Sequence, residues 1–287
     1  MIQIVTDSGA DLSEDQKKGL PIHFAPLRIT LGDKHYDEIN SITPAQFYEE
    51  LKETSEYPIT SQPTVGDFER IYREIAKTGQ QILSIHISSG LSGTLNSAKL
   101  AAQNVPEADI TFWDSKTLSA ALGWQVQAAA IAATKNWPME KILERLEIIR
   151  DQIDGFFTLK EMRYLVHGGR ISHIKGLMAQ VLNIKPIIFV EKVKGIYQSA
   201  GQAISLKNAI NQIVSINVEK FADAKVRVQL VHGSNMDSIE MLRSKIQEKM
   251  NVFFEDVVPV APVLGAHTGP TLVGIVIGPM AVFSNLI

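Results

Sequence analysis

The chain contains no cysteine among its 287 residues, which excludes disulfides, thiolate nucleophiles and cysteine-based metal sites. It also has no dense run of lysine or arginine, and its formal net charge is -3. The basic surface that binds nucleic acid is therefore missing, and we expect no nucleic-acid partner. The lack of cysteine fits a reducing compartment, so we expect a cytoplasmic protein.

Long uninterrupted apolar stretches are absent as well. The N-terminal segment turns polar at Thr6-Asp7, too early for a secretory signal. Residues 257–280 are the most apolar region, but Pro259, Pro262 and Pro270 interrupt it, whereas a membrane helix needs about 20 continuous apolar residues. We expect buried strands and loops in this region and, at most, transient contact with a membrane surface.

Short apolar runs alternate with amphipathic stretches in the first half of the chain. With 45% hydrophobic residues, the chain can bury a large core, and its length favours two domains. Strands alternating with helices predict an α/β domain with a parallel sheet flanked by helices. The expected strands cover residues 2–5, 81–87 and 110–113, and the expected helices cover residues 44–52, 65–77, 94–103, 118–134 and 139–150.

The pattern changes after Gly155, and we place a domain boundary there, giving domains at residues 1–154 and 155–287. The second half contains β-branched strand candidates at residues 226–231 and 272–277 and a proline-interrupted apolar run at residues 181–190. These features predict a C-terminal α/β or α+β domain.

Two hydroxyl-rich segments precede expected helices. Residues 88–94 read SSGLSGT, and residues 60–64 read TSQPT. A helix N-terminus has unpaired N–H groups and a positive partial charge, so either segment could bind a carboxylate or a phosphate. In parallel sheets, such loops converge at the carboxyl ends of the strands. The alternative for both segments is ordinary helix capping by Ser or Thr after a tight turn.

Two further side chains are candidates from the second half. His267 lies in LGAHTGP, expected to be a glycine-rich loop from which an imidazole could reach a ligand. Arg170 follows Gly168-Gly169 and could pair with an anion. The alternatives are a structural histidine and a salt bridge between elements.

A metal site at Asp7, Asp11 and Asp114 is conceivable, because all three follow or border expected strand ends. The chain lacks histidine pairs with metal-ligand spacing near them, and Asp residues at such turns usually accept bonds from backbone amides. We therefore predict no metal.

The order Ser92, Asp114, His267 matches that of hydrolases with a nucleophile elbow. The elbow requires G-x-S-x-G, whereas residues 90–94 read GLSGT. A hydrolase or phosphotransferase acting on a small ester or phosphorylated substrate remains the alternative function. A nucleotide-binding module has less support, since neither GxGxxG nor GxxxxGK[ST] occurs.

Several motifs together resemble one family. IVTDSGADL, TSQPT, SSGLSGT, Asp114-Ser115, GGRIS, LNIKPI and LGAHTGP follow one another through both halves of the chain. In this order they are similar to the DegV family of bacterial fatty-acid-binding proteins. The resemblance implies two α/β-type domains, a long-chain fatty acid as ligand, an apolar tunnel for its acyl chain, and no cofactor.

The resemblance also implies roles for individual residues. Thr60, Ser61, Ser92 and His267 would contact the fatty-acid carboxylate. Weaker candidates, for a supporting role or for partner contact, are Arg170, Thr94 and Ser115.

No catalytic residue is expected, because in this family a separate fatty acid kinase phosphorylates the bound acid for phospholipid synthesis. One departure bears on this partner. Where many relatives carry a basic stretch resembling K-x-R-T, residues 201–205 read GQAIS, so Gln202 and Ile204 bear on kinase docking, and Lys207 is the nearby cation that could compensate.

Overall fold

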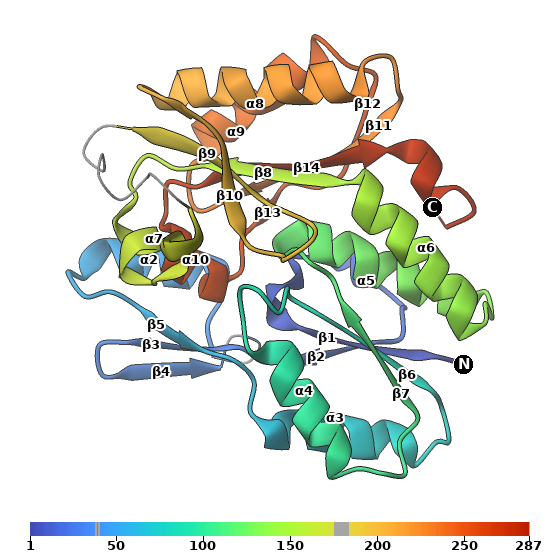
Figure 1. Cartoon of the computed structure of the whole chain (residues 1–287). Coiled ribbons are helices and arrows are strands. Elements are labelled where there is room, and N and C mark those ends of the chain that lie inside the picture. The colour runs from blue at the N-terminus through green and yellow to red at the C-terminus, as the bar shows by residue number, and fades with distance from the viewer. Residues whose placement is uncertain (38, 40, 175–183, 287) are drawn as a thin grey trace.

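The computed structural model describes residues 1–37, 39, 41–174 and 184–286 and arranges them in alternating layers of helices and sheets (Figure 1). From the bottom of Figure 1 upward, helices α3 and α4, a parallel sheet, the central helices α5 and α6, a second large sheet, and helices α8 and α9 follow one another. The mixed α/β architecture predicted from the sequence is confirmed.

The first sheet is parallel and has the strand order β2-β1-β6-β7. Its strands are β1 (Gln3–Asp7), β2 (Ile22–Ala25), β6 (Ile82–His86) and β7 (Ile110–Asp114). Every residue of β6 is buried, because helices cover both faces of the sheet. The covering helices are α3 (Val65–Ala76) and α4 (Thr94–Gln103) on one face and α5 (Ser119–Thr134) on the other.

A small antiparallel sheet with the order β4-β3-β5 lies beside the parallel sheet. Its strands are β3 (Arg28–Leu31), β4 (Lys34–Asp37) and β5 (Ile59–Ser61). Helix α2 (Pro44–Glu53) precedes β5 and begins at a capping box formed by Thr43 and Gln46. None of the three strands was expected from the sequence, because each is formed by a stretch of only three or four residues.

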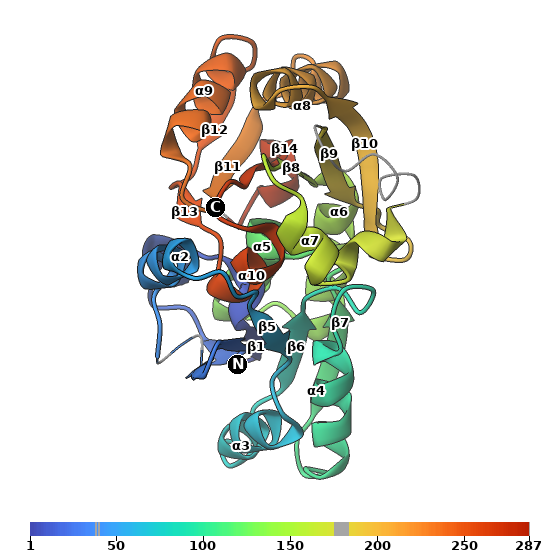
Figure 2. The same ribbon diagram turned by 90° about the vertical axis from the view of Figure 1, so that its left-hand side faces the viewer.

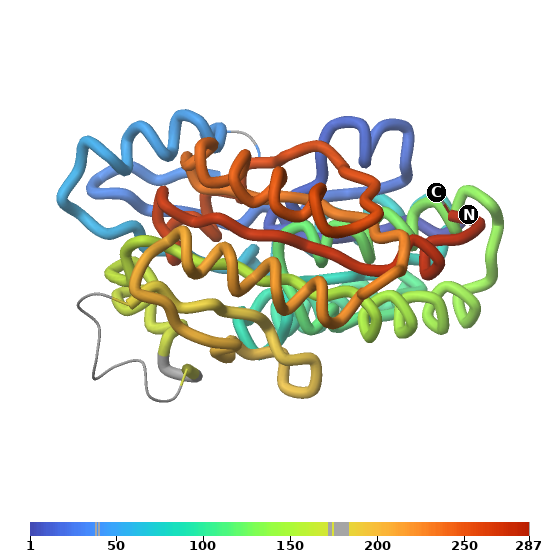
Figure 3. The backbone as a smooth tube through the Cα atoms, turned by 90° about the horizontal axis from the view of Figure 1, so that it is seen from above, coloured from blue at the N-terminus to red at the C-terminus, as the bar shows by residue number. Residues whose placement is uncertain are grey.

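The second large sheet belongs to the second half of the chain and has the order β10-β9-β8-β14-β11-β12, with β13 also pairing with β11. Its strands are β8 (Asp154–Thr158), β9 (Lys185–Val190), β10 (Tyr197–Ala203), β11 (Val226–His232), β12 (Val252–Phe254), β13 (Val258–Pro259) and β14 (Val273–Pro279). Helices α8 (Leu206–Phe221) and α9 (Met236–Gln247) cover its outer face (Figure 3).

Helix α5 lies between the two large sheets (Figure 2) and has apolar residues on all sides, with Gln125 and Gln127 as buried polar exceptions, as expected of a helix surrounded by protein. Its close approach to the N-terminal turn depends on Gly123, where a Cβ would lie 2.2 Å from the carbonyl oxygen of Ala10. The surrounding core includes residues from both halves, from Ile2 to Leu286. The boundary expected near residue 154 coincides with the start of β8, and the division into two domains stays a prediction.

The remaining elements are short, apart from α6 (Met139–Gln152), which packs against α5. They are α1 (Glu14–Lys17), α7 (Arg163–His167), α10 (Pro262–Thr268) and the 3-10 turns Ser8–Ala10, Arg170–His173 and Met280–Phe283. The region 257–280, expected to form strands and loops, therefore also contains a helix. No helix in the described part of the chain combines the length and apolar character needed to cross a membrane.

Candidate functional site

One cavity gathers most of the side chains singled out from the sequence. Thr60, Ser61, Ser92, Arg170 and His267 all line it. These residues come from β5, from the turn before α4, from a 3-10 turn after α7, and from α10. We call this space the hydroxyl cavity.

Thr60 and Ser61 reach the cavity from a strand, which corrects the expectation of a loop at a helix entrance. Both residues belong to β5, where they pair with Ile29 and Arg28 of β3. The entrance of α3 is capped by Thr64, whose side chain accepts a bond from the backbone N–H of Asp67. Helix capping, the alternative considered for residues 60–64, is therefore the role of Thr64 at the end of this segment. The hydroxyls of Thr60 and Ser61 take no part in the cap.

Ser92 lies in the turn that enters α4. The N-cap position is occupied by Gly93, which has no side chain to cap the helix. The Ser92 hydroxyl lies 2.8 Å from the Thr94 hydroxyl and 3.3 Å from the Thr94 backbone nitrogen. Thr94 is fully buried, so it orients Ser92 from behind, and Ser92 is the member of the pair that lines the cavity.

His267 lies on helix α10, not in the loop expected from the surrounding glycines. Pro262 starts this helix with its fixed backbone angle, and Gly269 ends it at a φ of 74°. The imidazole Nε2 lies 2.7 Å from the Thr60 hydroxyl. On the other side of the ring, Nδ1 lies so close to Gly168 that a Cβ there would be only 2.2 Å away.

The electrostatic environment keeps His267 neutral. Burial lowers its pKa to about 3, with smaller contributions from the positive charge of Arg170 and from His167. Because a neutral imidazole carries one N–H, a proton on Nε2 would bond to the oxygen of Thr60. The Thr60 hydroxyl hydrogen would then be free to point into the cavity.

Arg170 contributes a positive charge to the rim of the cavity. It is half-buried, and its Nη1 donates a 2.6 Å hydrogen bond to the carbonyl of Gly168. Ser115, in contrast, lies outside the hydroxyl cavity. Its hydroxyl bonds to the backbone of Thr117, and the residue lines a different cavity near Arg150 and Lys192.

A second, apolar cavity adjoins the hydroxyl cavity. Its walls come mainly from β8, β14, α10 and the start of α5, and include Phe156, Phe157, Val231, Leu272 and Val276. Both cavities share three wall residues, Leu118, Tyr197 and Leu264. The hydroxyl cavity therefore lies directly beside the apolar cavity.

The residues of the hydrolase alternative do not form a triad. Asp114 bonds to Ser89 and Lys116, Ser92 bonds to Thr94, and His267 bonds to Thr60. A general base must lie within hydrogen-bond reach of its nucleophile. The geometry of these three side chains does not support nucleophilic catalysis.

The acidic residues considered for a metal site have other partners. Asp7 accepts bonds from the backbone N–H groups of Gly9 and Ile87, and Asp11 accepts bonds from Ser119 and the N–H of Ala261. Within the described ranges, no group of three metal-ligating side chains occurs.

Three contributors to the site were missed by the sequence reasoning. Tyr197 lines both cavities, Gln62 packs over the turn at Gly93, and Gly168 makes room for His267. Gln62 sits inside the TSQPT motif and could have been included with it. No local signal marks Tyr197, because its position depends on pairing between β9 and β10.

The chain therefore has an α/β fold with a hydroxyl-lined cavity beside an apolar one. The family model described as "Uncharacterised protein, DegV family COG1307" matches residues 1–279, so the chain belongs to the DegV family. A DegV domain-containing protein of Staphylococcus aureus is 34% identical, over 96% of this chain and 97% of its own length.

Solved structures of DegV proteins have the same fold. A DegV family protein from Thermus thermophilus, described as binding fatty acid, superposes with a TM-score of 0.87 at 30% identity, covering 97% of this chain and 99% of its own. DegV from Bacillus subtilis, described as a fatty acid binding protein, gives a TM-score of 0.88 at 27% identity with the same coverage. The family and fold expected from the motifs are thus confirmed.

Proposed function

We propose that this protein binds a long-chain fatty acid, with the carboxylate in the hydroxyl cavity and the acyl chain in the apolar cavity. The observation that carries the proposal is the shared wall of Leu118, Tyr197 and Leu264 between the two cavities. The fatty-acid binding described for the relatives from Thermus thermophilus and Bacillus subtilis supports it.

The polar cavity has the donors that a carboxylate requires. Thr60, Ser61 and Ser92 offer hydroxyl groups, and Arg170 adds a positive charge at the rim. The Ser61 hydroxyl makes no hydrogen bond within the described residues, so it is available to a ligand. Neutral His267 contributes by turning the Thr60 hydroxyl toward the acid, because its Nε2 lies against that oxygen.

The apolar cavity would supply most of the affinity. Each methylene transferred from water to an apolar site contributes about 0.8 kcal/mol. A long acyl chain therefore accounts for most of the binding free energy, while a few polar contacts fix the position of its head group.

We further propose that the bound acid is presented to a separate fatty acid kinase in the cytoplasm, and that the resulting acyl phosphate feeds phospholipid synthesis. The absence of a formed triad at Ser92, Asp114 and His267 favours a carrier over an independent enzyme. Gln202 and Ile204 are both exposed at the end of β10, and exposed Lys207 follows them. Within residues 201–207, Lys207 is the one cation, where the pattern of many relatives has two.

Denaturing mass spectrometry of the purified protein tests lipid binding. We expect release of a tetradecanoic to octadecanoic acid, or uptake of such an acid added to delipidated protein. Finding neither would contradict the proposal. Kinase presentation is tested separately, by measuring acyl phosphate formation when a fatty acid kinase is supplied with the loaded protein or with free acid.

A further inference from the structure

Tyr197 carries a buried hydrogen-bond donor without a partner. The residue is only 3% exposed, and it lines both the hydroxyl cavity and the apolar cavity. Its phenol hydroxyl makes no hydrogen bond within the described residues. Because a buried tyrosine hydroxyl normally has a hydrogen-bond partner, the partner of Tyr197 comes from whatever fills the cavity.

The charge of Arg170 indicates which of the two cavities the phenol hydroxyl faces. Burial raises the pKa of Tyr197, and the positive charge of Arg170 opposes this rise. Among the described residues, Arg170 lines the hydroxyl cavity but not the apolar cavity. The phenol oxygen therefore lies on the side of the head group. Because its pKa is raised, the phenol keeps its proton near neutral pH and can donate a hydrogen bond.

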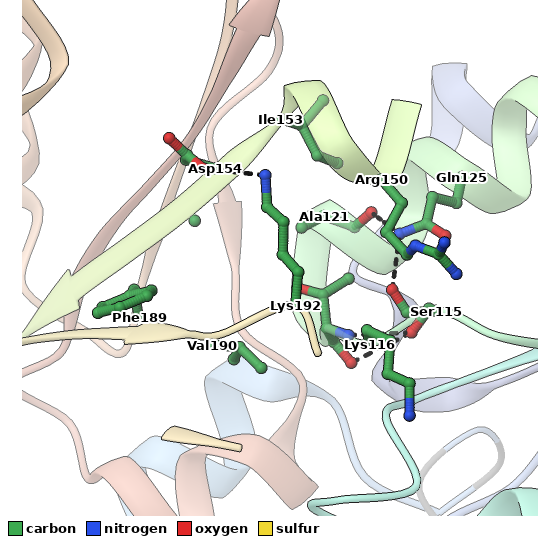
Figure 4. Close-up of a pocket in the computed structure, with 12 residues that line it drawn as sticks. Ser115, Lys116, Ala121, Gln125, Arg150, Ile153, Asp154, Phe189, Val190 and Lys192 are labelled. Atoms are coloured by element: carbon green, nitrogen blue, oxygen red, sulfur yellow. Dashed lines mark hydrogen bonds and ion pairs between the residues drawn. The ribbon is translucent and has the colours of Figure 1, made fainter. Parts of the chain in front are cut away.

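Packing fixes the ring of Tyr197 at the junction of the two cavities. Tyr197 begins β10 and pairs with Val190 of β9, and its ring contacts that of Phe157 edge-on, with 5.5 Å between the centroids. Beside Val190, the Lys192 ammonium lies 3.2 Å from a carboxylate oxygen of Asp154 and holds the end of β9 against β8 (Figure 4). A donor that is already fixed loses little conformational entropy when a ligand binds.

The turn between β9 and β10 rests on Ser88, at the start of the hydroxyl-rich segment 88–94. The Ser88 hydroxyl donates a 2.7 Å hydrogen bond to the carbonyl of Gly195 and accepts one from the N–H of Gly90. Gly195 has a φ of 68°, and a Cβ there would clash with the Ser88 oxygen. Glycine is therefore required at this contact, which joins the two halves of the chain two residues before Tyr197.

We propose that Tyr197 is a further contact of the fatty-acid carboxylate and that Ser88 is the residue that positions it. The proposal rests on the fatty-acid binding inferred above. The phenol donates to a carboxylate oxygen from the second half of the chain, alongside the hydroxyls that Thr60, Ser61 and Ser92 supply from the first half. The segment SSGLSGT then has two roles, because Ser92 lines the cavity and Ser88 holds the β9–β10 hairpin that carries Tyr197.

Tyr197→Phe removes the hydroxyl and keeps the ring. Calorimetry on delipidated full-length protein would use tetradecanoic, hexadecanoic or octadecanoic acid, whichever the unmutated protein binds most tightly. We expect binding to weaken between about fivefold and about thirtyfold. The matched control is Tyr72→Phe, which removes a buried hydroxyl that lies 2.7 Å from the Ser84 hydroxyl, away from both cavities, and should leave affinity within about twofold. Unchanged affinity in Tyr197→Phe would overturn the proposal, whereas failure of the unmutated protein to bind any of the acids would overturn the proposed function instead.

The signal of the bound carboxyl group distinguishes a direct contact from a structural effect. The acid would be isotopically labelled at its carboxyl carbon and followed by nuclear magnetic resonance. Because a hydrogen bond to the carboxylate changes the electron distribution at that carbon, the chemical shift of the bound acid should change in Tyr197→Phe and stay the same in Tyr72→Phe. A bound signal that is identical in Tyr197→Phe and the unmutated protein would show that the phenol does not contact the carboxylate.

Ser88→Ala tests whether Ser88 acts through Tyr197. Alone it should weaken binding about threefold, whereas in the Tyr197→Phe background it should cause no further loss, because the hydroxyl that it positions is already gone. Ser89→Ala is the matched control, since its hydroxyl bonds to Asp114 and not to the hairpin, and it should leave affinity unchanged. Losses that multiply in the double variant would contradict the positioning role. Thermal unfolding without ligand checks that each variant folds.

Discussion

Two groups of polar side chains lie between the halves of the protein, and they differ in burial and in their bonding partners. Beside α5, the indole of Trp124 donates to Gln229, which exchanges bonds with Gln16. Arg227 pairs with Glu255 through Nε and with Gln127 through Nη2, while its buried Nη1 has no hydrogen-bond partner among the described residues. We call this group the α5 network. In the hydroxyl cavity, by contrast, Ser61 and Arg170 keep unused bonding capacity.

The difference separates stability from ligand binding. A paired, buried network stabilises one arrangement of the two halves, and losing a member leaves its partners unsatisfied. Polar groups that line an open cavity are satisfied by water or by ligand, so their removal changes affinity more than folding. The α5 network should therefore respond to mutation in unfolding experiments, and the hydroxyl cavity in binding experiments.

Arg227→Ala should cause the largest loss of stability among the variants considered. A small loss would contradict the distinction between the α5 network and the hydroxyl cavity. The side chain is fully buried, pairs with Glu255 and stacks against Trp124 and Phe283. Removing one member of such a pair costs about 3–5 kcal/mol. Urea unfolding should show this loss, while the folded fraction retains fatty-acid affinity. Unchanged stability would show that the network does not hold the halves together.

The pH dependence of His267 should give the next largest effect. Its pKa of about 3 is below the ordinary value of 6.5, so between these values the unfolded chain binds a proton that the folded protein does not. Stability is therefore full above pH 6.5 and falls as the pH decreases toward 3, by about 2 kcal/mol at pH 5.

His267→Gln removes this contribution. The difference in unfolding free energy between pH 7 and pH 5 should shrink by about 2 kcal/mol relative to the unmutated protein. Urea titrations of ligand-free protein at both pH values measure it. An identical pH dependence in the two proteins would show that His267 is not held neutral by its surroundings.

Ser92→Ala tests whether a residue of the hydroxyl cavity affects fatty-acid affinity. Loss of one hydroxyl donor to the carboxylate should weaken fatty-acid binding by about 1–2 kcal/mol. Ser89→Ala in the same turn is the matched control, because its hydroxyl bonds to Asp114 outside the cavity. Calorimetry should show normal affinity for the control, and equal loss in both would point to the turn backbone instead.

Thr60→Val is expected to have the smallest effect. Valine keeps the shape of the side chain but removes the contact with His267 Nε2 and the hydroxyl that we propose donates to the acid. We expect affinity to fall by about 1 kcal/mol and the free energy of unfolding to change by a similar or smaller amount. A loss of stability much larger than the loss of affinity would show that Thr60, like the α5 network, contributes mainly to stability.

Local pattern sufficed for the longer helices of the first half and for strands β1, β6 and β7. The helices expected at residues 65–77 and 94–103 are observed at Val65–Ala76 and Thr94–Gln103, because their apolar spacing and start signals agree. The short strand β5 and the helix carrying His267 were mistaken for loops. Their conformations depend on pairing with β3 and on packing against α2, neither of which local periodicity encodes.

The sequence by itself determined three of the four strands of the parallel sheet, the family and most of the polar side chains that line the hydroxyl cavity, since these follow from motifs and from apolar periodicity. Only the tertiary structure decided that Thr60 meets His267, that Ser115 lies in another cavity, and that Tyr197 joins the wall. The physical reason is that periodicity reports which face of an element is buried, whereas a cavity arises where faces distant in the chain fail to fill the space between them.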